Sequence, residues 1–136
     1  MNIDAEELMT AEVVTVSEET PLSVALGIMQ EHDIRHLPVV RGKRLVGMLS
    51  DRDLSGLGLR LAVDMETLER LESKLRATVK SAMSSHLVTV HPSSDLGEII
   101  DRLVEERIGA VPVVEEDELV GIVSYVDVLR AVRDGL

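Results

Sequence analysis

Changes in the spacing of apolar residues divide the first part of the chain into predicted elements. A β-branched run over 13–16 predicts a short buried strand. Thr20-Pro21 then marks a helix start, with proline at the first helical position. Beyond it, apolar residues recur every three or four positions, the spacing of one helix face. They are Leu22, Ala25, Leu26 and Met29.

Two closely spaced apolar runs follow this helix. They lie in the predicted strands 37–40 and 44–49, and the residues between these strands, 41–43, are polar and include a glycine. Two strands joined by so short a turn are typical of a hairpin. A further helix is expected to begin near Ser50. The predicted order is therefore strand, helix, strand, strand, helix.

The same order returns 74 residues later (88 − 14 = 74), because Met9–Ser55 aligns with Met83–Leu129 without a gap. The second copy predicts a strand over 87–90, a helix from Ser94, strands over 111–114 and 119–123, and a last helix from Ser124. Its first helix has the apolar face Leu96, Ile99, Ile100 and Leu103. Three strands are too few for a stable unit. We therefore expect an α/β (α+β) fold of two β-α-β-β-α units packed sheet to sheet with approximate twofold symmetry.

A stretch rich in helix formers separates the two copies. Leucines recur at helical spacing over Met65–Lys80, which predicts a helix, and Gly56 and Gly58 either separate it from the preceding helix or kink that helix. The predicted division is a first unit at 1–62, a helical linker at 63–80 and a second unit at 81–136.

Composition excludes several classes of partner. The net charge of −11 (14 basic and 25 acidic residues) repels phosphate backbones. Because Tyr125 is the single aromatic residue, the chain lacks the aromatic side chains on which proteins that bind single-stranded nucleic acids stack the bases. There is no cysteine, so disulfides and thiolate metal sites are excluded. No apolar run approaches membrane-spanning length, and the N-terminus is acidic where a signal peptide would be basic. We expect a soluble, cytoplasmic protein with no nucleic-acid or membrane partner.

The pattern G-x-x-S-x-x-D occurs in both copies, as Gly47–Asp53 and Gly121–Asp127. We expect the strand to end and the helix to begin at its serine, which brings a hydroxyl, a carboxylate and free N–H groups of the helix start together. Such a corner can hold the ribose and phosphate of a nucleotide. The alternative is that S-x-x-D is only a capping box, which needs no ligand.

These features together resemble a tandem pair of cystathionine-β-synthase (CBS) domains, often called a Bateman module. The resemblance covers Met9 to Leu129 and rests on the leading methionines, the V-T-V strands, the I-x-x-[LV]-P-V-V segments and the two G-x-x-S-x-x-D motifs. It implies a regulatory module that binds AMP, ADP, ATP or S-adenosylmethionine in clefts between its units and signals to a partner protein. It also implies a homodimer packed through helices and no required cofactor. With no fused effector segment, we expect a free-standing module.

The resemblance implies two ligand sites. The first comprises Ser50, Asp53, Met48, Arg52, Arg35, His86, Val88, Ile108, Gly109 and Ala110. The second comprises Ser124, Asp127, Ile122, Glu12, Val14, Ile34, Arg35 and His36. The first has two arginines for phosphate, whereas Gly109 and Val126 stand at the matching places of the second. We expect the first site to bind phosphorylated nucleotides more tightly, and the second to prefer adenosine-like or cationic ligands or to stay empty.

Other functions are weaker interpretations of the same residues. His32 and His36 have the spacing of a zinc-binding helix pair, but the helix should end near Asp33 and no third ligand is evident. Ser50, Asp53 and His36 have the side chains of a nucleophilic triad without a strained elbow or an oxyanion site. We therefore predict no metal site and no enzyme, and the alternative function is a structural dimerisation or interaction module with no ligand.

The two hairpin turns differ in charge. One is basic, with Arg41, Lys43 and Arg44, and its counterpart over 115–118 is wholly acidic. Both are interpreted as solvated hairpin tips.

Overall fold

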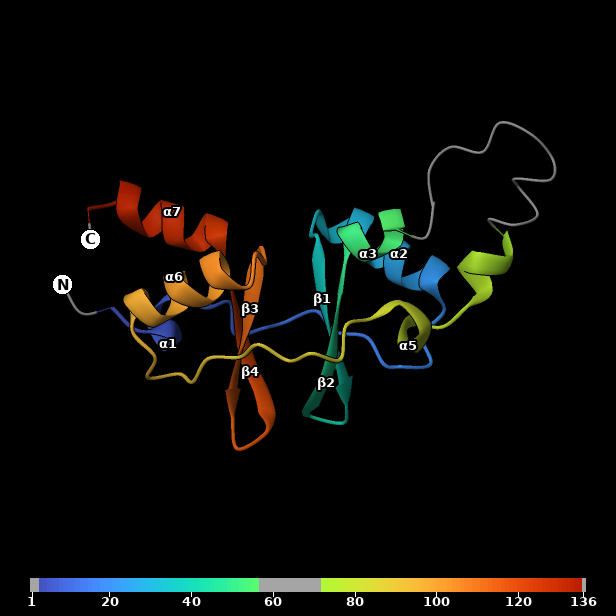
Figure 1. Cartoon of the computed structure of the whole chain (residues 1–136), viewed down its shortest axis with the longest axis horizontal. Helices are drawn as coiled ribbons and strands as arrows, with labels where there is room; N and C mark the ends of the chain where they lie inside the picture. The colour runs from blue at the N-terminus through green and yellow to red at the C-terminus, as the bar shows by residue number, and fades with distance from the viewer. Residues whose placement is uncertain (1–2, 57–71, 136) are drawn as a thin grey trace. The chain divides into compact units, whose positions relative to one another are not determined.

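The computed structural model describes residues 3–56 and 72–135 and divides into two compact units (Figure 1). Unit 1 comprises Met1–Val13, Gly42–Leu45 and Leu87–Leu136, and unit 2 comprises Val14–Arg41 and Val46–His86. The compact units thus differ from the sequence repeats, because the segment that leads into each repeat packs with the other repeat. Both units mix helices and strands, as the sequence predicts.

Unit 2 holds the first repeat. Its elements are α2 (Leu22–His32), β1 (His36–Arg41), β2 (Arg44–Ser50), α3 (Asp51–Gly56) and α5 (Val79–Ala82), although the first residues of β2 belong to unit 1. The predicted hairpin is confirmed, with Gly42 in its turn at φ +64°. Pro21 is the N-cap of α2 rather than its first helical residue. The helix ends at His32, because Asp33 takes a left-handed conformation.

Unit 1 holds the second repeat. Its elements are α1 (Ala5–Leu8), α6 (Leu96–Glu105), β3 (Ala110–Glu115), β4 (Glu118–Ser124) and α7 (Tyr125–Arg133). β3 and β4 pair antiparallel, with Val111 opposite Val123 and Ala110 opposite Ser124. The turn between them has positive φ at Glu116 and Asp117, which suits a two-residue hairpin turn.

Each unit has its own hydrophobic core, and the leading segment of the other repeat contributes to it. In unit 2, Val79 of α5 is fully buried against the apolar face of α2 and the inner residues of β1 and β2. In unit 1, Ala5 of α1 is fully buried against α6, β3 and β4. The predicted face of α6 is only partly correct, because Ile99 and Leu103 are buried whereas Ile100 is exposed.

The predicted first strands, 13–16 and 87–90, are wrong as strands. Each is reduced to one residue, Val16 or Val90, which forms a single parallel bridge with β1 or β3. The Val16 N–H donates to the Pro38 carbonyl and the Val40 N–H donates to the Val16 carbonyl. Val90 forms the same two bonds with Pro112 and Val114. Both valines are nevertheless buried, as expected.

The continuous helix predicted over Met65–Lys80 is wrong at its C-terminal end. Residues 72–76 are helical, but Thr78 is extended and α5 begins only at Val79. The break satisfies backbone groups at the start of α2, since the Leu22 N–H donates to the Ala77 carbonyl and the Val79 N–H donates to the Thr20 carbonyl, each at 2.8 Å. Residues 57–71, which carry Gly58 and the N-terminal part of the predicted helix, lie outside the described residues.

The interpretation of the hairpin turns as solvated tips is incomplete. Within unit 1, Arg44 stands opposite Glu118 in an antiparallel pair, and the Leu119 N–H donates to the Lys43 carbonyl at 2.9 Å. The side chains are exposed, but the backbone of the basic tip is paired with that of the acidic tip. Opposite charges directly across two strands stabilise such a pair.

None of the helices in the described part of the chain combines the length and the apolar character needed to cross a membrane.

Candidate functional site

The first Ser-x-x-Asp motif forms a complete capping box where β2 ends and α3 begins. The Ser50 N–H donates to Asp53 Oδ2 at 2.8 Å, and the Asp53 N–H donates to Ser50 Oγ at 3.2 Å. The predicted handover from strand to helix at the serine is confirmed. Both residues are partly buried, so the carboxylate is held in one orientation at the corner.

The second motif repeats this geometry between β4 and α7. The Ser124 N–H donates to Asp127 Oδ2 at 2.8 Å, and the Asp127 N–H donates to Ser124 Oγ at 3.2 Å. The Ser124 hydroxyl also donates to Asp127 Oδ2 at 3.0 Å. In both corners these bonds use Oδ2, so within the described residues Oδ1 of each aspartate keeps its acceptor capacity for another donor.

The expectation of free N–H groups at the two helix starts is largely wrong. Besides the N–H groups of the capping box, the N–H of Asp51 donates to the Arg35 carbonyl, and that of Tyr125 donates to the Gly109 carbonyl, both at 3.0 Å. At each helix start, therefore, at most one backbone N–H can bind an anion, that of the second helical residue, Arg52 or Val126. A phosphate at either corner must therefore be held mainly by side chains.

Arg35 supplies a cation at the first corner. Its Nη1 lies 3.9 Å from Asp51 Oδ2, and the two side chains are 76% and 53% exposed. An ion pair this long and exposed stabilises the protein little. The guanidinium is therefore free to reorient toward an anionic ligand at little cost.

His36 lies among the charges of the first corner. Burial lowers the pKa of His36 below its ordinary value, and Asp51, Arg35 and Asp53 act on it as nearby charges. Among the ligand sites, His36 was expected only in the second, whereas the structure places it beside the first corner. This placement could be predicted from the hairpin, because the register set by its turn puts Arg35 and His36 beside the last residues of β2.

The lowered pKa of His36 predicts a pH dependence of stability. As the pH falls, the His36 ring takes up a proton in the unfolded chain before it does so in the folded protein. The contribution of neutral His36 to the free energy of unfolding is therefore complete above its unfolded pKa near 6.5. It is lost as the pH falls through the lower pKa of the folded protein. We expect acidification below pH 6.5 to lower the melting temperature less in His36→Gln than in the unchanged protein. His91→Gln, at an exposed histidine, is the control. Equal acid sensitivity in all three proteins would contradict the prediction.

The structure divides the predicted site residues between the units. Unit 2 contains Ser50, Asp53, Met48, Arg52, Arg35 and His86 of the first site, and Val14, Ile34 and His36 of the second. Unit 1 contains Ser124, Asp127, Ile122 and Glu12 of the second site, and Val88, Ile108, Gly109 and Ala110 of the first. Within each unit, the pre-strand residue lies beside that unit's own corner: Arg35 at Ser50, and Gly109 at Ser124. The assignment of residues across the two units stays a prediction.

The apolar site residues Met48 and Ile122 are each fixed by a leading segment. Met48 exchanges backbone hydrogen bonds of 3.0 and 2.8 Å with Ser84, and Ile122 exchanges bonds of 2.9 and 3.1 Å with Thr10. Both side chains are half-buried, so they offer apolar surface two residues before each serine.

No group of three metal-ligating side chains occurs within the residues that the structure describes. His32 ends α2 and His36 begins β1, so the two do not share a helix face.

Comparison with known proteins gives one consistent relationship. The family model of the CBS domain matches residues 5–58 and 79–134. Hypoxic response protein 1 of Mycobacterium tuberculosis is 34% identical over 127 residues, which cover 93% of this chain and 82% of that protein. A crystal structure of that protein contains two coordinated zinc ions and has a TM-score of 0.75 to this chain at 32% identity, over 95% of this chain and 98% of that one.

Two other solved structures are similar over nearly the whole chain. The Vibrio cholerae protein AcuB, named for acetoin utilization, has a TM-score of 0.82 at 28% identity and covers 98% of this chain and 93% of its own. CBSX2, solved in complex with AMP, has a TM-score of 0.80 at 28% identity and covers 96% of each chain. The resemblance inferred from the repeats is thereby confirmed, and the protein belongs to the CBS domain family as a tandem pair of CBS domains.

Proposed function

We propose that this protein is a regulatory module that binds adenosine-containing ligands at its two serine/aspartate corners and signals their presence to a partner protein. The observation that carries the proposal is the aspartate of each corner, which is oriented by a capping box through Oδ2 while Oδ1 has acceptor capacity left. A ribose hydroxyl that donates to a fixed carboxylate forms a charge-assisted hydrogen bond. The presence of AMP in the related CBSX2 structure supports the choice of ligand class.

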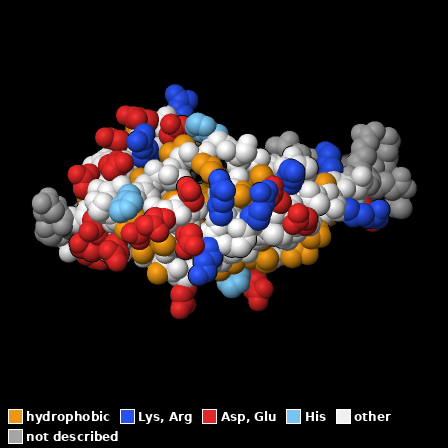
Figure 2. Space-filling model, turned by 90° about the horizontal axis from the view of Figure 1, so that it is seen from below, with side chains coloured by type: hydrophobic (Ala, Val, Ile, Leu, Met, Phe, Trp, Pro, Cys, Tyr) orange, Lys and Arg blue, Asp and Glu red, His pale blue; other side chains and the backbone are white. Residues whose placement is uncertain are grey.

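The charge of each unit supports different ligands at the two corners. Counted from the sequence, unit 2 has 8 basic and 10 acidic residues, a net charge of −2, and unit 1 has 6 basic and 15 acidic residues, a net charge of −9. Figure 2 shows acidic side chains crowded over the part of the surface that unit 1 forms. We propose that the Ser50 corner, with Arg35 and Arg52, takes AMP, ADP or ATP. The Ser124 corner takes uncharged or cationic adenosyl ligands such as S-adenosylmethionine, because phosphate is repelled there.

Ligand-dependent melting tests this function directly. We expect AMP or ATP to raise the melting temperature by mass action, since ligand at about 100 times its Kd adds roughly 2.7 kcal/mol to the free energy of unfolding. GMP, with the same phosphate and a different base, is the control for adenine selectivity. No shift with any adenine nucleotide or S-adenosyl compound at millimolar concentration would end the ligand-binding proposal.

A structural interaction module without a ligand is the second candidate. The observation in its favour is that both capping boxes are complete by themselves. Under this alternative, Ser50→Ala lowers the free energy of unfolding by about 1 kcal/mol, and added nucleotide changes the stability of neither protein. Calorimetry of both proteins with and without AMP separates the two functions.

We further propose that the module works as a homodimer in the cytoplasm, catalyses no reaction itself and needs no cofactor. The lack of a strained nucleophile at Ser50 supports a binding role, because its hydroxyl is engaged by the Asp53 N–H at a helix start. The exposed apolar residues of α6 and α7 support self-association.

A further inference from the structure

The two corners share one strand register, which places His36 precisely. The backbone bond between the helix start and the residue before the strand is 3.0 Å long in each repeat. In the second repeat this bond lies next to the antiparallel pair of Ala110 and Ser124. Because the residues of the two bonds correspond at the repeat offset, the matching pair in the first repeat is His36 and Ser50. Side chains directly opposite each other lie on the same face of a hairpin, so His36 and Ser50 share a face.

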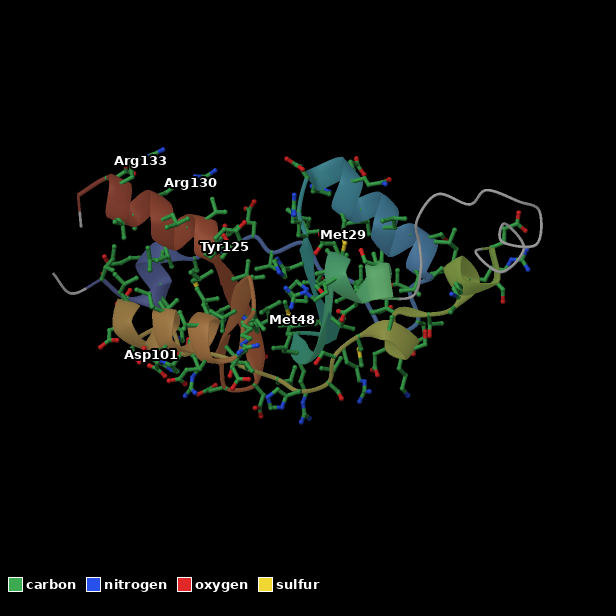
Figure 3. The ribbon with its side chains drawn as sticks, turned by 45° about the horizontal axis from the view of Figure 1, so that its top comes forward. Met29, Met48, Asp101, Tyr125, Arg130 and Arg133 are labelled. Atoms are coloured by element: carbon green, nitrogen blue, oxygen red, sulfur yellow. The ribbon has the colours of Figure 1, made fainter. Side chains whose placement is uncertain are left out.

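The chemistry at this place differs between the two corners. His36 is half-buried, and its ring makes no hydrogen bond to any residue that the structure describes. Its counterpart Ala110 is 4% exposed and has no polar side-chain atom. Figure 3 shows Tyr125 at the start of α7, the place that Asp51 takes at the start of α3. Of the two corners, only the first therefore has an imidazole opposite its serine.

His36 is surrounded by charges of both signs. Burial lowers the pKa of His36, Asp51 and Asp53 oppose this effect, and Arg35 and Arg52 add to it. The ring of the free protein is therefore neutral at neutral pH. A phosphate bound beside the arginines adds negative charge near the ring, and nearby negative charge favours the protonated form of a histidine. Phosphate binding should thus raise the pKa of His36 above its value in the free protein.

Among the described residues, α2 and the segment bonded to β2 add no charge to this balance. α2 contacts β1, and the charged side chains at its end are exposed. They are Glu31, His32 and Asp33. The segment bonded to Met48, which Figure 3 labels on β2, carries the exposed His86. None of these side chains is among the charges that act on His36, so its proton uptake depends on burial, on α3 and on the residue before β1.

We propose that His36 makes nucleotide binding at the Ser50 corner proton-linked: the protonated ring binds the ligand's phosphate beside Arg35, so the affinity for phosphorylated adenosine ligands rises as the pH falls. Linkage makes the effect reciprocal, because a phosphate that favours the protonated ring is itself bound more tightly by protein that carries the proton. The gain in affinity begins as the pH falls through the pKa of His36 in the complex. It is complete below the lower pKa of the free protein. This inference rests on the ligand of the proposed function and adds its regulation by pH.

Calorimetric titration with AMP at pH 7.5 and pH 5.5 tests the linkage. Relative to His36→Gln, the unchanged protein should gain about 10-fold in affinity on acidification, the usual contribution of one charge-assisted hydrogen bond. The phosphate of AMP also titrates near pH 6, but this change is common to both proteins and cancels in the comparison. His36→Arg keeps a cation at both pH values, so it should bind AMP tightly at both. His32→Gln, at an exposed histidine near the end of α2, is the control and should behave as the unchanged protein does.

A second measurement counts the protons directly. Titrations at pH 6.5 in two buffers of different ionisation enthalpy should show that the unchanged protein takes up more protons for each AMP bound than His36→Gln does, by a fraction of one proton. Adenosine, which has no phosphate, should show no such difference. A role of His36 in folding alone would change the affinity of His36→Gln equally at both pH values and would leave the proton count unchanged.

The outcomes separate this inference from the ligand proposal. AMP binding with the same pH dependence and the same proton uptake in the unchanged protein and in His36→Gln would overturn the proton linkage and leave the ligand proposal intact. An equal difference in proton uptake with adenosine would also overturn it, because the phosphate would not be the cause. No AMP binding at either pH would contradict both proposals.

Discussion

Asp53→Ala should strongly reduce the rise in melting temperature that AMP or ATP produces, whereas Asp127→Ala should retain most of it. Asp53 is the proposed acceptor for the ribose hydroxyls at the corner that has Arg35 and Arg52, and removal of a charged acceptor costs about 1.5–3 kcal/mol of binding, roughly 10- to 100-fold in affinity. The second corner should contribute little with these ligands, because it lacks both arginines and lies in the more acidic unit. The measurement is a nucleotide titration of melting temperature for each variant.

The internal repeat provides the control for this experiment. Both aspartates accept the N–H of their serine at 2.8 Å, and each substitution removes this bond but leaves the backbone N–H of the substituted residue to donate to serine Oγ. Asp127→Ala also removes the 3.0 Å bond from the Ser124 hydroxyl. Without nucleotide, both variants should lose about 1 kcal/mol of stability. Their difference with nucleotide then reports binding and not capping. If the response is equally reduced in both variants, the two corners do not differ in phosphate preference. If both variants keep it in full, the ligand lies elsewhere.

Local sequence signals predicted the parts of the corners that depend on local geometry. The hairpin, the handover from strand to helix at Ser50 and Ser124, and the end of α2 near Asp33 all follow from residues close in the sequence. The approach of Arg35 to Ser50 also follows, because a short turn fixes the register of the two strands. Each of these features is determined within one repeat.

Features that depend on contacts between distant segments were not predictable in the same way. The length of the first strands depends on pairing with a strand more than twenty residues later, and only Val16 and Val90 form such a bridge, with β1 and β3. The break at Ala77 and Thr78 depends on backbone groups of α2 that lie more than fifty residues earlier. Propensity favoured a continuous helix there, and tertiary hydrogen bonds overrode it.

The exchange of leading segments also explains the glycine that stands three residues before the serine of each motif, at Gly47 and Gly121. A Cβ at Gly47 would lie 2.6 Å from Met83 Sδ and 3.1 Å from the Ser84 carbonyl oxygen. At Gly121 a Cβ would meet Met9 Sδ, would lie 2.8 Å from Met9 Cγ and would lie 3.0 Å from Met9 Cβ. The glycines therefore let the leading methionines pack directly on the strands.

Gly121→Ala should consequently lower the free energy of unfolding by about 1–3 kcal/mol, the usual cost of overpacking. Rotation of the methionine end cannot relieve the clash, because Met9 Cβ is itself too close and the Met9 N–H is bonded to the Ala5 carbonyl at 2.8 Å. Gly27→Ala in α2 is the control, since no atom lies within 4 Å of its added Cβ and alanine favours the helix by roughly 0.5–1 kcal/mol.

A double-mutant cycle in urea identifies the contact that carries the loss. Met9→Ala removes the atoms that the new Cβ would strike, so Gly121→Ala should cost less in its presence than alone, with a coupling of about 0.5–3 kcal/mol. Strictly additive losses would place the strain elsewhere in β4. A Gly121→Ala protein as stable as the unchanged one would mean that the leading segment does not pack on β4 as described, and the bond between Thr10 and Ile122 that fixes the second corner would lose its support.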